Sequence, residues 1–127
     1  MIGGKVLDPS VLAEFVEGSI AMEAWLDVAA TQGVVFFVPS LAVGEVRAVY
    51  PDRSAHLRRL VDHSQVVVRE LTHAEAPVVA KLLADARCFD AAAGHVILVA
   101  RQRGWPVLTA DPGRLQRIAP DLDLDLL

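Results

Sequence analysis

Four acidic residues each stand at the end of an apolar run or near the start of an expected helix. Segments far apart in sequence can meet at one edge of a parallel sheet, which would bring such carboxylates together. Carboxylate oxygens are ligands that Mg²⁺ and Mn²⁺ favour. The residues are Asp8 in VLDPS, Glu45 in VPSLAVGEV, Asp90 in FDAAAGHV and Asp111 in VLTADP. Their placement predicts a site for a divalent cation.

The elements that must position these acids alternate between strands and helices. VVFFVP is a continuous β-rich run, typical of a strand buried on both faces. Thr72 and Glu75 have the spacing of a capping box, which starts a helix. Strands are expected at 4–8, 34–39, 65–71, 106–110 and in the final DLDLDLL. Helices are expected at 10–16, 20–32, 40–49, 52–62, from the capping box to 86, at 90–103 and at 112–118.

Strands separated by helices indicate parallel pairing with helices on both faces of the sheet. The expected fold is a three-layer α/β/α sandwich around a mainly parallel sheet of four to five strands, formed by a single domain over residues 1–127. Ligands of such sheets bind beyond the carboxyl ends of the strands. Asp8 and Asp111 fall there directly, and Glu45 lies on the helix that leaves the second strand.

The net charge of −4 argues against nucleic-acid binding through overall attraction, because domains that bind in this way are usually basic. A carboxylate cluster neutralised by bound cations would contain part of that negative charge. Contacts with nucleic acid would then depend on local arginines. Arg114 and Arg117 follow Asp111 and are candidates for contacts with RNA phosphates, although a solvated helix face explains them equally well.

The chain shows no membrane or export signal. No stretch approaches the apolar length that crosses a bilayer, and MIGGKVLD lacks a signal-peptide pattern. Cys88 is the only cysteine and cannot form an internal disulfide, which agrees with a reducing compartment. A cytoplasmic protein without a membrane segment is therefore expected.

The motifs of other enzyme classes are absent. The chain contains no GxSxG nucleophile elbow, no P-loop, no GxGxxG and no pair of histidines at zinc-ligand spacing. A bound divalent cation can polarise a phosphodiester and lower the pKa of an attacking water, so no other nucleophile is needed. A metal-dependent hydrolase is the first functional hypothesis.

Essentially the whole chain resembles the PIN domain, and the VapC-type toxin ribonucleases of bacterial toxin–antitoxin pairs most of all. The resemblance is carried by VLDPSVL, by Pro-Ser separated from Glu45 by four residues, by an acid at a helix start, and by PVLTADPGRL. It implies metal coordination by Asp8, Glu45 and Asp111, with the hydroxyl groups of Ser10 and Thr109 supporting the site. It also implies an RNA substrate, a homodimer and a small antitoxin partner.

The third acid departs from the family pattern. An aspartate usually stands about eleven residues before the glycine that ends its helix, and Ala93 occupies that place when counted from Gly104. Asp90 lies three residues earlier, on the same helix face but about 4.5 Å further along the axis. It could reach a metal directly, reach it through a water, or miss it, and a longer connection after the helix would restore the alignment. An N-cap role explains Asp90 equally well.

Three functional hypotheses remain. In the first, Asp8, Glu45, Asp111 and Asp90 hold Mg²⁺ or Mn²⁺ that activates water against an RNA phosphodiester, which makes the chain an endoribonuclease and the toxin of a toxin–antitoxin pair. In the second, suggested by Ala93, a degenerate PIN-like domain binds RNA or protein without cutting. The third, a signalling receiver domain, fits poorly because the first strand ends in one acid rather than an acidic pair.

Overall fold

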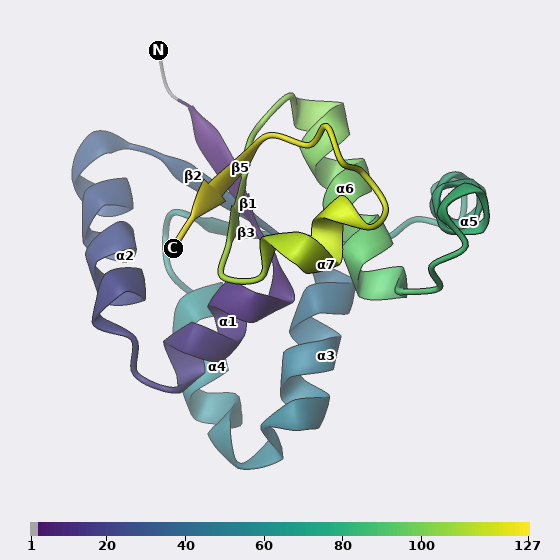
Figure 1. The fold of residues 1–127 in the computed structure, drawn as a ribbon. Coiled ribbons are helices and arrows are strands. Elements are labelled where there is room, and N and C mark those ends of the chain that lie inside the picture. Colours follow the sequence, from purple (N-terminus) through teal and green to yellow (C-terminus); the bar gives the residue numbers. More distant parts are fainter. Residues whose placement is uncertain (1–2) are drawn as a thin grey trace.

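The computed structural model describes residues 3–127, and the strands in this range form one five-stranded sheet (Figure 1). All neighbouring strands run parallel, in the order β3-β2-β1-β4-β5. The strands are β1 (Gly4–Leu7), β2 (Val35–Pro39), β3 (Val66–Arg69), β4 (Val107–Thr109) and β5 (Leu124–Leu126). The helices are α1 (Pro9–Val16), α2 (Ile20–Gln32), α3 (Ser40–Val49), η1 (Pro51–Arg53, a 3-10 helix), α4 (Ser54–Val61), α5 (Ala76–Ala86), α6 (Ala91–Arg103) and α7 (Pro112–Gln116). The expected α/β fold is confirmed.

Alternate residues of the central strands contribute to two separate cores. In β1, Val6 packs with α6 and α7, whereas Leu7 packs with α1 and α2. In β2, Phe37 and Phe36 divide in the same way, because successive side chains of a strand point to opposite faces. Helices α1 to α4 contribute to the core on one face, and α6 and α7 to the core on the other (Figure 1). These are the three layers that the sequence predicts.

The expected elements differ from the observed ones mainly at their ends. The polar helix expected at 52–62 divides into η1 and α4, with Pro51 at the first position of η1, where its missing N–H costs no hydrogen bond. The capping box forms: Glu75 N donates to Thr72 Oγ1 at 3.2 Å, and Thr72 N donates to Glu75 Oε1 at 3.0 Å. The regular helix α5 begins at Ala76, one residue after Glu75.

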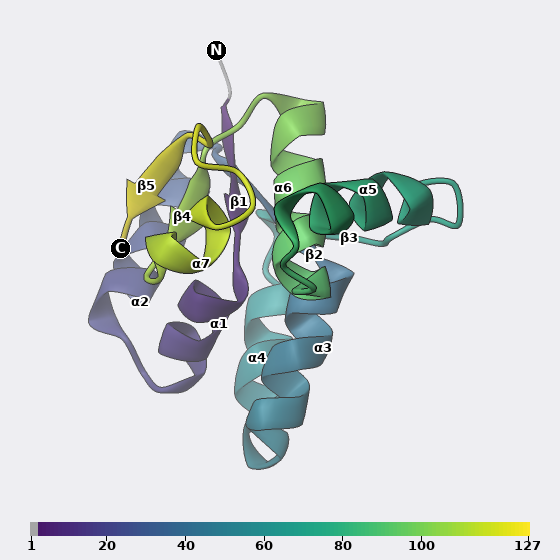
Figure 2. The same ribbon diagram turned by 45° about the vertical axis from the view of Figure 1, so that its right-hand side comes forward.

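Helix α6 is buried around its whole circumference because α5 covers its outer side (Figure 2). Every residue from 92 to 100 is buried. The two helices approach closely at Gly94, where a Cβ would lie 2.9 Å from Val79 Cγ1 and 3.0 Å from Leu83 Cδ2. The missing side chain of Gly94 thus allows the contact that excludes water from α6.

One buried residue of α6, His95, has no polar partner. Its side chain is fully buried, and neither ring nitrogen forms a hydrogen bond. Burial lowers the pKa of His95 below its ordinary value; Arg69 of β3 also lowers it, and Glu75 at the start of α5 raises it. The folded state therefore favours the neutral imidazole.

We expect the wild-type protein to lose stability more steeply than His95→Leu as the pH falls from about 7 to about 5. The unfolded chain takes up a proton near the ordinary histidine pKa of about 6.5, whereas the folded chain resists protonation, so acid favours unfolding. Thermal unfolding followed by circular dichroism measures the effect. His56→Gln, at an exposed position of α4, should keep the wild-type pH dependence. Parallel curves for wild type and His95→Leu would contradict the prediction.

The carboxyl ends of the parallel strands define the edge where the predicted acids lie. Strand β1 ends directly before Asp8, and β4 ends two residues before Asp111. Helix α3 follows β2 at once and carries Glu45, while α6 begins directly after Asp90 and leads back into β4. All four acids thus belong to segments that start at this edge. None of the helices in residues 3–127 has the length and apolar character required to span a bilayer.

Candidate active site

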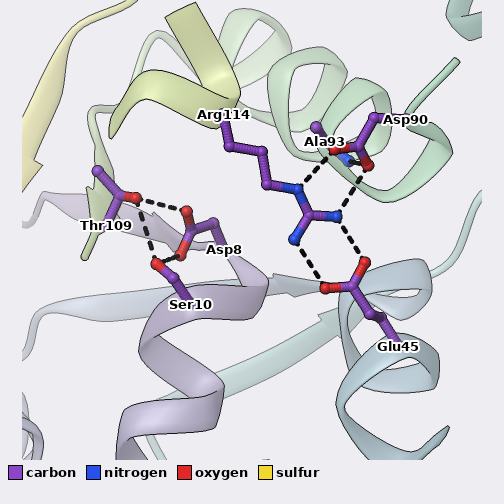
Figure 3. A network of polar contacts seen from close by, with 7 residues as sticks. All are labelled: Asp8, Ser10, Glu45, Asp90, Ala93, Thr109 and Arg114. Atoms are coloured by element: carbon purple, nitrogen blue, oxygen red, sulfur yellow. Dashed lines mark hydrogen bonds and ion pairs between the residues drawn. The ribbon is translucent and has the colours of Figure 1, made fainter. Parts of the chain in front are cut away.

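Asp8 is a fully buried carboxylate at the junction of β1 and α1. As the N-cap of α1 it accepts a hydrogen bond from Val11 N through Oδ1, at 3.2 Å. Ser10 Oγ donates to the same oxygen at 2.6 Å, and Thr109 Oγ1 donates to Oδ2 at 2.5 Å (Figure 3). The Asp8 side chain can therefore cap α1 and belong to the site at once, because the same hydrogen bonds fix both of its carboxylate oxygens.

Burial raises the pKa of Asp8 above its ordinary value. The hydrogen bonds from Ser10, Thr109 and Val11 act in the opposite direction but do not cancel the cost of removing the charge from water. A nearby cation would reverse this shift by stabilising the ionised form. A positively charged neighbour would therefore stabilise the ionised Asp8 carboxylate.

Two hydroxyl groups connect the ends of β1 and β4. Ser10 Oγ lies 3.3 Å from Thr109 Oγ1 and accepts a hydrogen bond from Ala110 N at 2.8 Å. Thr109, which is fully buried, accepts through Oγ1 from Asp111 N at 2.9 Å. The hydroxyls of Ser10 and Thr109 thus fix the Asp8 carboxylate and the backbone at Asp111 relative to each other.

A second polar group forms around Arg114, the third residue of α7 (Figure 3). Its Nη1 and Nη2 donate to Glu45 Oε2 and Oε1 at 2.7 and 2.5 Å. Its Nε and Nη2 donate to Asp90 Oδ2 and Oδ1 at 2.6 and 2.8 Å. One guanidinium therefore holds both carboxylates in bidentate fashion, the strong geometry for this kind of pair.

The contacts within this cluster shift the pKa values of Asp90 and Arg114. Hydrogen bonds from Arg114 lower the pKa of Asp90, and those to Glu45 and Asp90 raise the pKa of Arg114. Their side chains are only partly exposed, at 22% for Arg114, 24% for Asp90 and 34% for Glu45, so solvent screens the ion pairs incompletely. Two carboxylates thus share one guanidinium in this cluster.

The position of Asp90 combines its two predicted roles. It is the N-cap of α6 and accepts a hydrogen bond from Ala93 N at 3.2 Å. The same carboxylate extends to Arg114 and so faces Glu45 across the guanidinium. Ala93 is fully buried in the core with Val6. The acid three residues before the usual position therefore turns towards Glu45.

Residues 5–120 match the sequence model of the PIN domain. The chain belongs to the PIN domain family. PIN domains are generally metal-dependent nucleases. No relative among curated proteins matches the sequence. The family expected from VLDPSVL and PVLTADPGRL is confirmed, and the chain-wide extent of the match agrees with it.

Solved structures with the same fold cover nearly the whole chain. VapBC2 from Rickettsia felis, bound to a DNA fragment from its promoter, is 14% identical with a TM-score of 0.71, over 100% of this chain and 99% of that one. PAE2754 from Pyrobaculum aerophilum is 16% identical with a TM-score of 0.67, over 97% and 92%. FitAB bound to the IR36 DNA fragment is 18% identical with a TM-score of 0.62, over 99% and 94%. At these identities the likeness concerns the fold.

The oxygen donors of this PIN domain fit Mg²⁺ or Mn²⁺ in kind, and Asp8 is a buried carboxylate that a cation would stabilise. The spacing of the carboxylates in this structure does not yet fit an ion. Within residues 3–127, no three His, Cys, Asp or Glu side chains converge closely enough to hold an ion. Asp111 is exposed, and its side chain makes no capping hydrogen bond to α7. The structure brings Glu45 and Asp90 together, and joins Asp8 to Ser10 and Thr109.

Arg114 has a contact that the sequence analysis missed. The sequence suggested an RNA phosphate as its partner, whereas in the PIN domain the guanidinium binds Glu45 and Asp90. Arg117, its neighbour in the next turn, is exposed, and no ion pair is recorded for it among residues 3–127. One signal could have identified the contact: clustered carboxylates without a metal need a positive partner, and Arg114 follows Asp111 closely.

Proposed function

We propose that this PIN domain is a Mg²⁺- or Mn²⁺-dependent endoribonuclease whose metal ligands are Asp8, Glu45, Asp90 and Asp111. The observation that carries the proposal is the fully buried Asp8 carboxylate at the end of the central strand. Burying a charge is unfavourable unless a partner compensates for it. In a family of nucleases, a bound cation is the partner that explains this position best.

The residues around the site have distinct tasks in this proposal. A bound divalent cation would supply the acidified water and would stabilise charge on the phosphodiester. Ser10 and Thr109 hold the Asp8 carboxylate in one orientation, and Thr109 also fixes the backbone at Asp111. Arg117 is exposed in the turn after Arg114 and is available for a phosphate of the RNA backbone.

We further propose that the chain is the toxin of a toxin–antitoxin pair, is cytoplasmic, forms a homodimer and is neutralised by a small antitoxin. The support is the family resemblance and the fold shared with VapBC2 and FitAB, each solved as a DNA complex. Co-expression with the product of the adjacent small gene, followed by affinity purification, tests the partnership. Recovery of the homodimer without the co-expressed product would contradict the proposed partnership with an antitoxin.

RNA cleavage by the purified chain tests the central proposal. A labelled RNA should be cut internally in the presence of Mn²⁺ or Mg²⁺ and should stay intact with EDTA, because the metal supplies the nucleophile. A DNA of the same sequence serves as the matched substrate control. Cleavage that persists in EDTA, or no cleavage of any RNA at millimolar Mn²⁺, would contradict the proposal.

A second candidate function is a PIN-like domain that binds RNA or protein without cutting. The contact between Arg114 and the Glu45–Asp90 pair favours it, because these acids are already neutralised by an internal cation. Calorimetric titration with Mn²⁺ separates the two functions. Binding that depends on Asp8 and Glu45 supports the nuclease, whereas the absence of binding at millimolar Mn²⁺ supports the second function.

A further inference from the structure

The guanidinium of Arg114 lies where two of the proposed metal ligands face each other. Its Nη2 contacts Glu45 Oε1 and Asp90 Oδ1 at once, so these two oxygens can be no further apart than the sum of the two contacts (Figure 3). The oxygen acceptors of both carboxylates are engaged by this one side chain. Arg114 therefore acts as the cation of the pair.

A metal ion and the guanidinium cannot hold the pair in the same way. Two oxygens bound to one Mg²⁺ at about 2.0–2.1 Å lie no more than about 4.2 Å apart, and each must direct a lone pair at the ion. Arg114 instead donates four hydrogen bonds, so lone pairs of Glu45 and Asp90 point at the guanidinium. The arginine stays charged at any physiological pH, so loss of a proton cannot release it.

We propose that Arg114 is a built-in competitor of the metal, which neutralises Glu45 and Asp90 in the metal-free protein and must leave them before the ion binds. This inference rests on the proposed function and adds a regulatory contact to the same site. The contact is autoinhibitory, because part of the metal's binding free energy is used to displace the arginine. The wild-type protein therefore binds Mn²⁺ more weakly than its carboxylates alone would.

The local structure permits this exchange. Arg114 belongs to α7, a helix of five residues, and its side chain is 22% exposed. Its backbone need not move, since a long side chain that reaches solvent can change rotamer on a fast time scale. Glu45 and Asp90 come from α3 and from the start of α6, so both carboxylates keep their backbone positions when the guanidinium leaves.

Calorimetric titration of the full chain with Mn²⁺ tests the inference. Arg114→Met removes the charge but keeps an unbranched stem, and it should bind Mn²⁺ about tenfold or more tightly than wild type, within the usual range for coupled sites. Arg117→Met is the matched control: it removes the same charge three residues away, where the guanidinium has no hydrogen bond to Glu45 or Asp90 and is the smallest of the causes that lower the pKa of Asp90. This control should change the Mn²⁺ affinity by less than about threefold.

Thermal unfolding gives a second measurement that does not depend on activity. Without metal, Arg114→Met should unfold at a lower temperature than wild type, because Glu45 and Asp90 lose their shared cation. Added Mn²⁺ should raise its Tm by more than it raises that of wild type. Arg117→Met should show the wild-type response. An equal response to Mn²⁺ in wild type and Arg114→Met would overturn the inference.

The outcomes separate this inference from the proposed function. If wild type binds Mn²⁺ and Arg114→Met binds it no more tightly, the competition is refuted while the metal site stands. If neither protein binds Mn²⁺ at millimolar concentration, both the metal site and the competition are refuted. If Arg114→Met does not fold, Arg114→Lys replaces it in the Mn²⁺ titration. A single ammonium cannot form bidentate pairs with both acids, so tighter Mn²⁺ binding by this variant supports the inference and unchanged binding overturns it.

Discussion

Replacement of Asp8 by Asn is expected to abolish Mn²⁺-dependent RNA cleavage while leaving a folded protein that is at least as stable as wild type at neutral pH. A lost metal ligand removes several kcal/mol of transition-state stabilisation, which corresponds to a rate reduction of about 10³-fold or more. Asn keeps the size of the side chain and an oxygen that can cap α1. The initial rate of RNA cleavage at saturating Mn²⁺ measures the loss.

The expected stability of Asp8→Asn follows from the raised pKa of Asp8. A carboxyl whose pKa is higher in the folded state favours folding below its unfolded pKa, and this contribution is lost as the pH rises through the folded value. In the metal-free protein, ionisation of the buried Asp8 carboxylate therefore opposes folding. Asp8→Asn removes the charge, so its Tm should equal or exceed that of wild type at pH 7, with a smaller advantage at acid pH.

An exposed aspartate provides the control for Asp8. Asp27 lies on α2, away from the strand ends, and its replacement by Asn should leave both RNA cleavage and Tm at wild-type values. The prediction is contradicted if Asp8→Asn cuts RNA at the wild-type rate. It is also contradicted if Asp8→Asn unfolds several degrees below wild type at pH 7 without metal, since burial of the charge would then not be destabilising.

Replacement of Asp90 by Asn is expected to lower Mn²⁺ affinity and RNA cleavage by about 10–100-fold, with a modest loss of Tm because the ion pair with Arg114 is removed. The carboxylate faces Glu45 across Arg114, and we propose that it binds the metal once the arginine leaves. Asn caps a helix about as well as Asp, so α6 keeps its start. Titration with Mn²⁺ and cleavage rates, compared with wild type, measure the effect.

Comparison with Asp90→Ala separates the two roles of this residue. Alanine removes the carboxylate and also the N-cap of α6, which contributes about 1 kcal/mol. It should therefore match Asp90→Asn in activity but unfold about 3–5 °C lower. If Asp90→Asn binds Mn²⁺ as wild type does, Asp90 serves as a cap and as a partner of Arg114 but not as a metal ligand, and the third ligand position is vacant in this PIN domain.

Much of the fold could be predicted from local sequence rules. Helix α2 begins after Ser19 and ends at Gly33, because a side-chain oxygen satisfies the first free N–H groups and glycine adopts the left-handed conformation that stops a helix. The apolar run of β2 fits a strand covered on both faces, and its residues 36 to 39 are buried. Parallel pairing followed from helix-length connections between strands.

The polar contacts of the site could be predicted only in part. The sequence placed Asp8 and Asp111 beyond strand ends, and the family resemblance supplied Ser10 and Thr109 as neighbours. The sequence gave no partner for Arg114 within the chain, because Glu45 lies 69 positions away and Asp90 24 positions away. Such contacts depend on how α3, α6 and α7 meet, and no local rule sets those positions.

The sequence by itself thus determined the order of strands and helices, the edge at which the acids gather and the family to which the chain belongs. These depend on hydrophobic periodicity, caps and motifs, which act over a few residues. Only the tertiary structure decided that Asp8 is fully buried and that Arg114 joins Glu45 to Asp90. Burial and charge pairing are set by the packing of distant segments, so both emerge only when the layers come together.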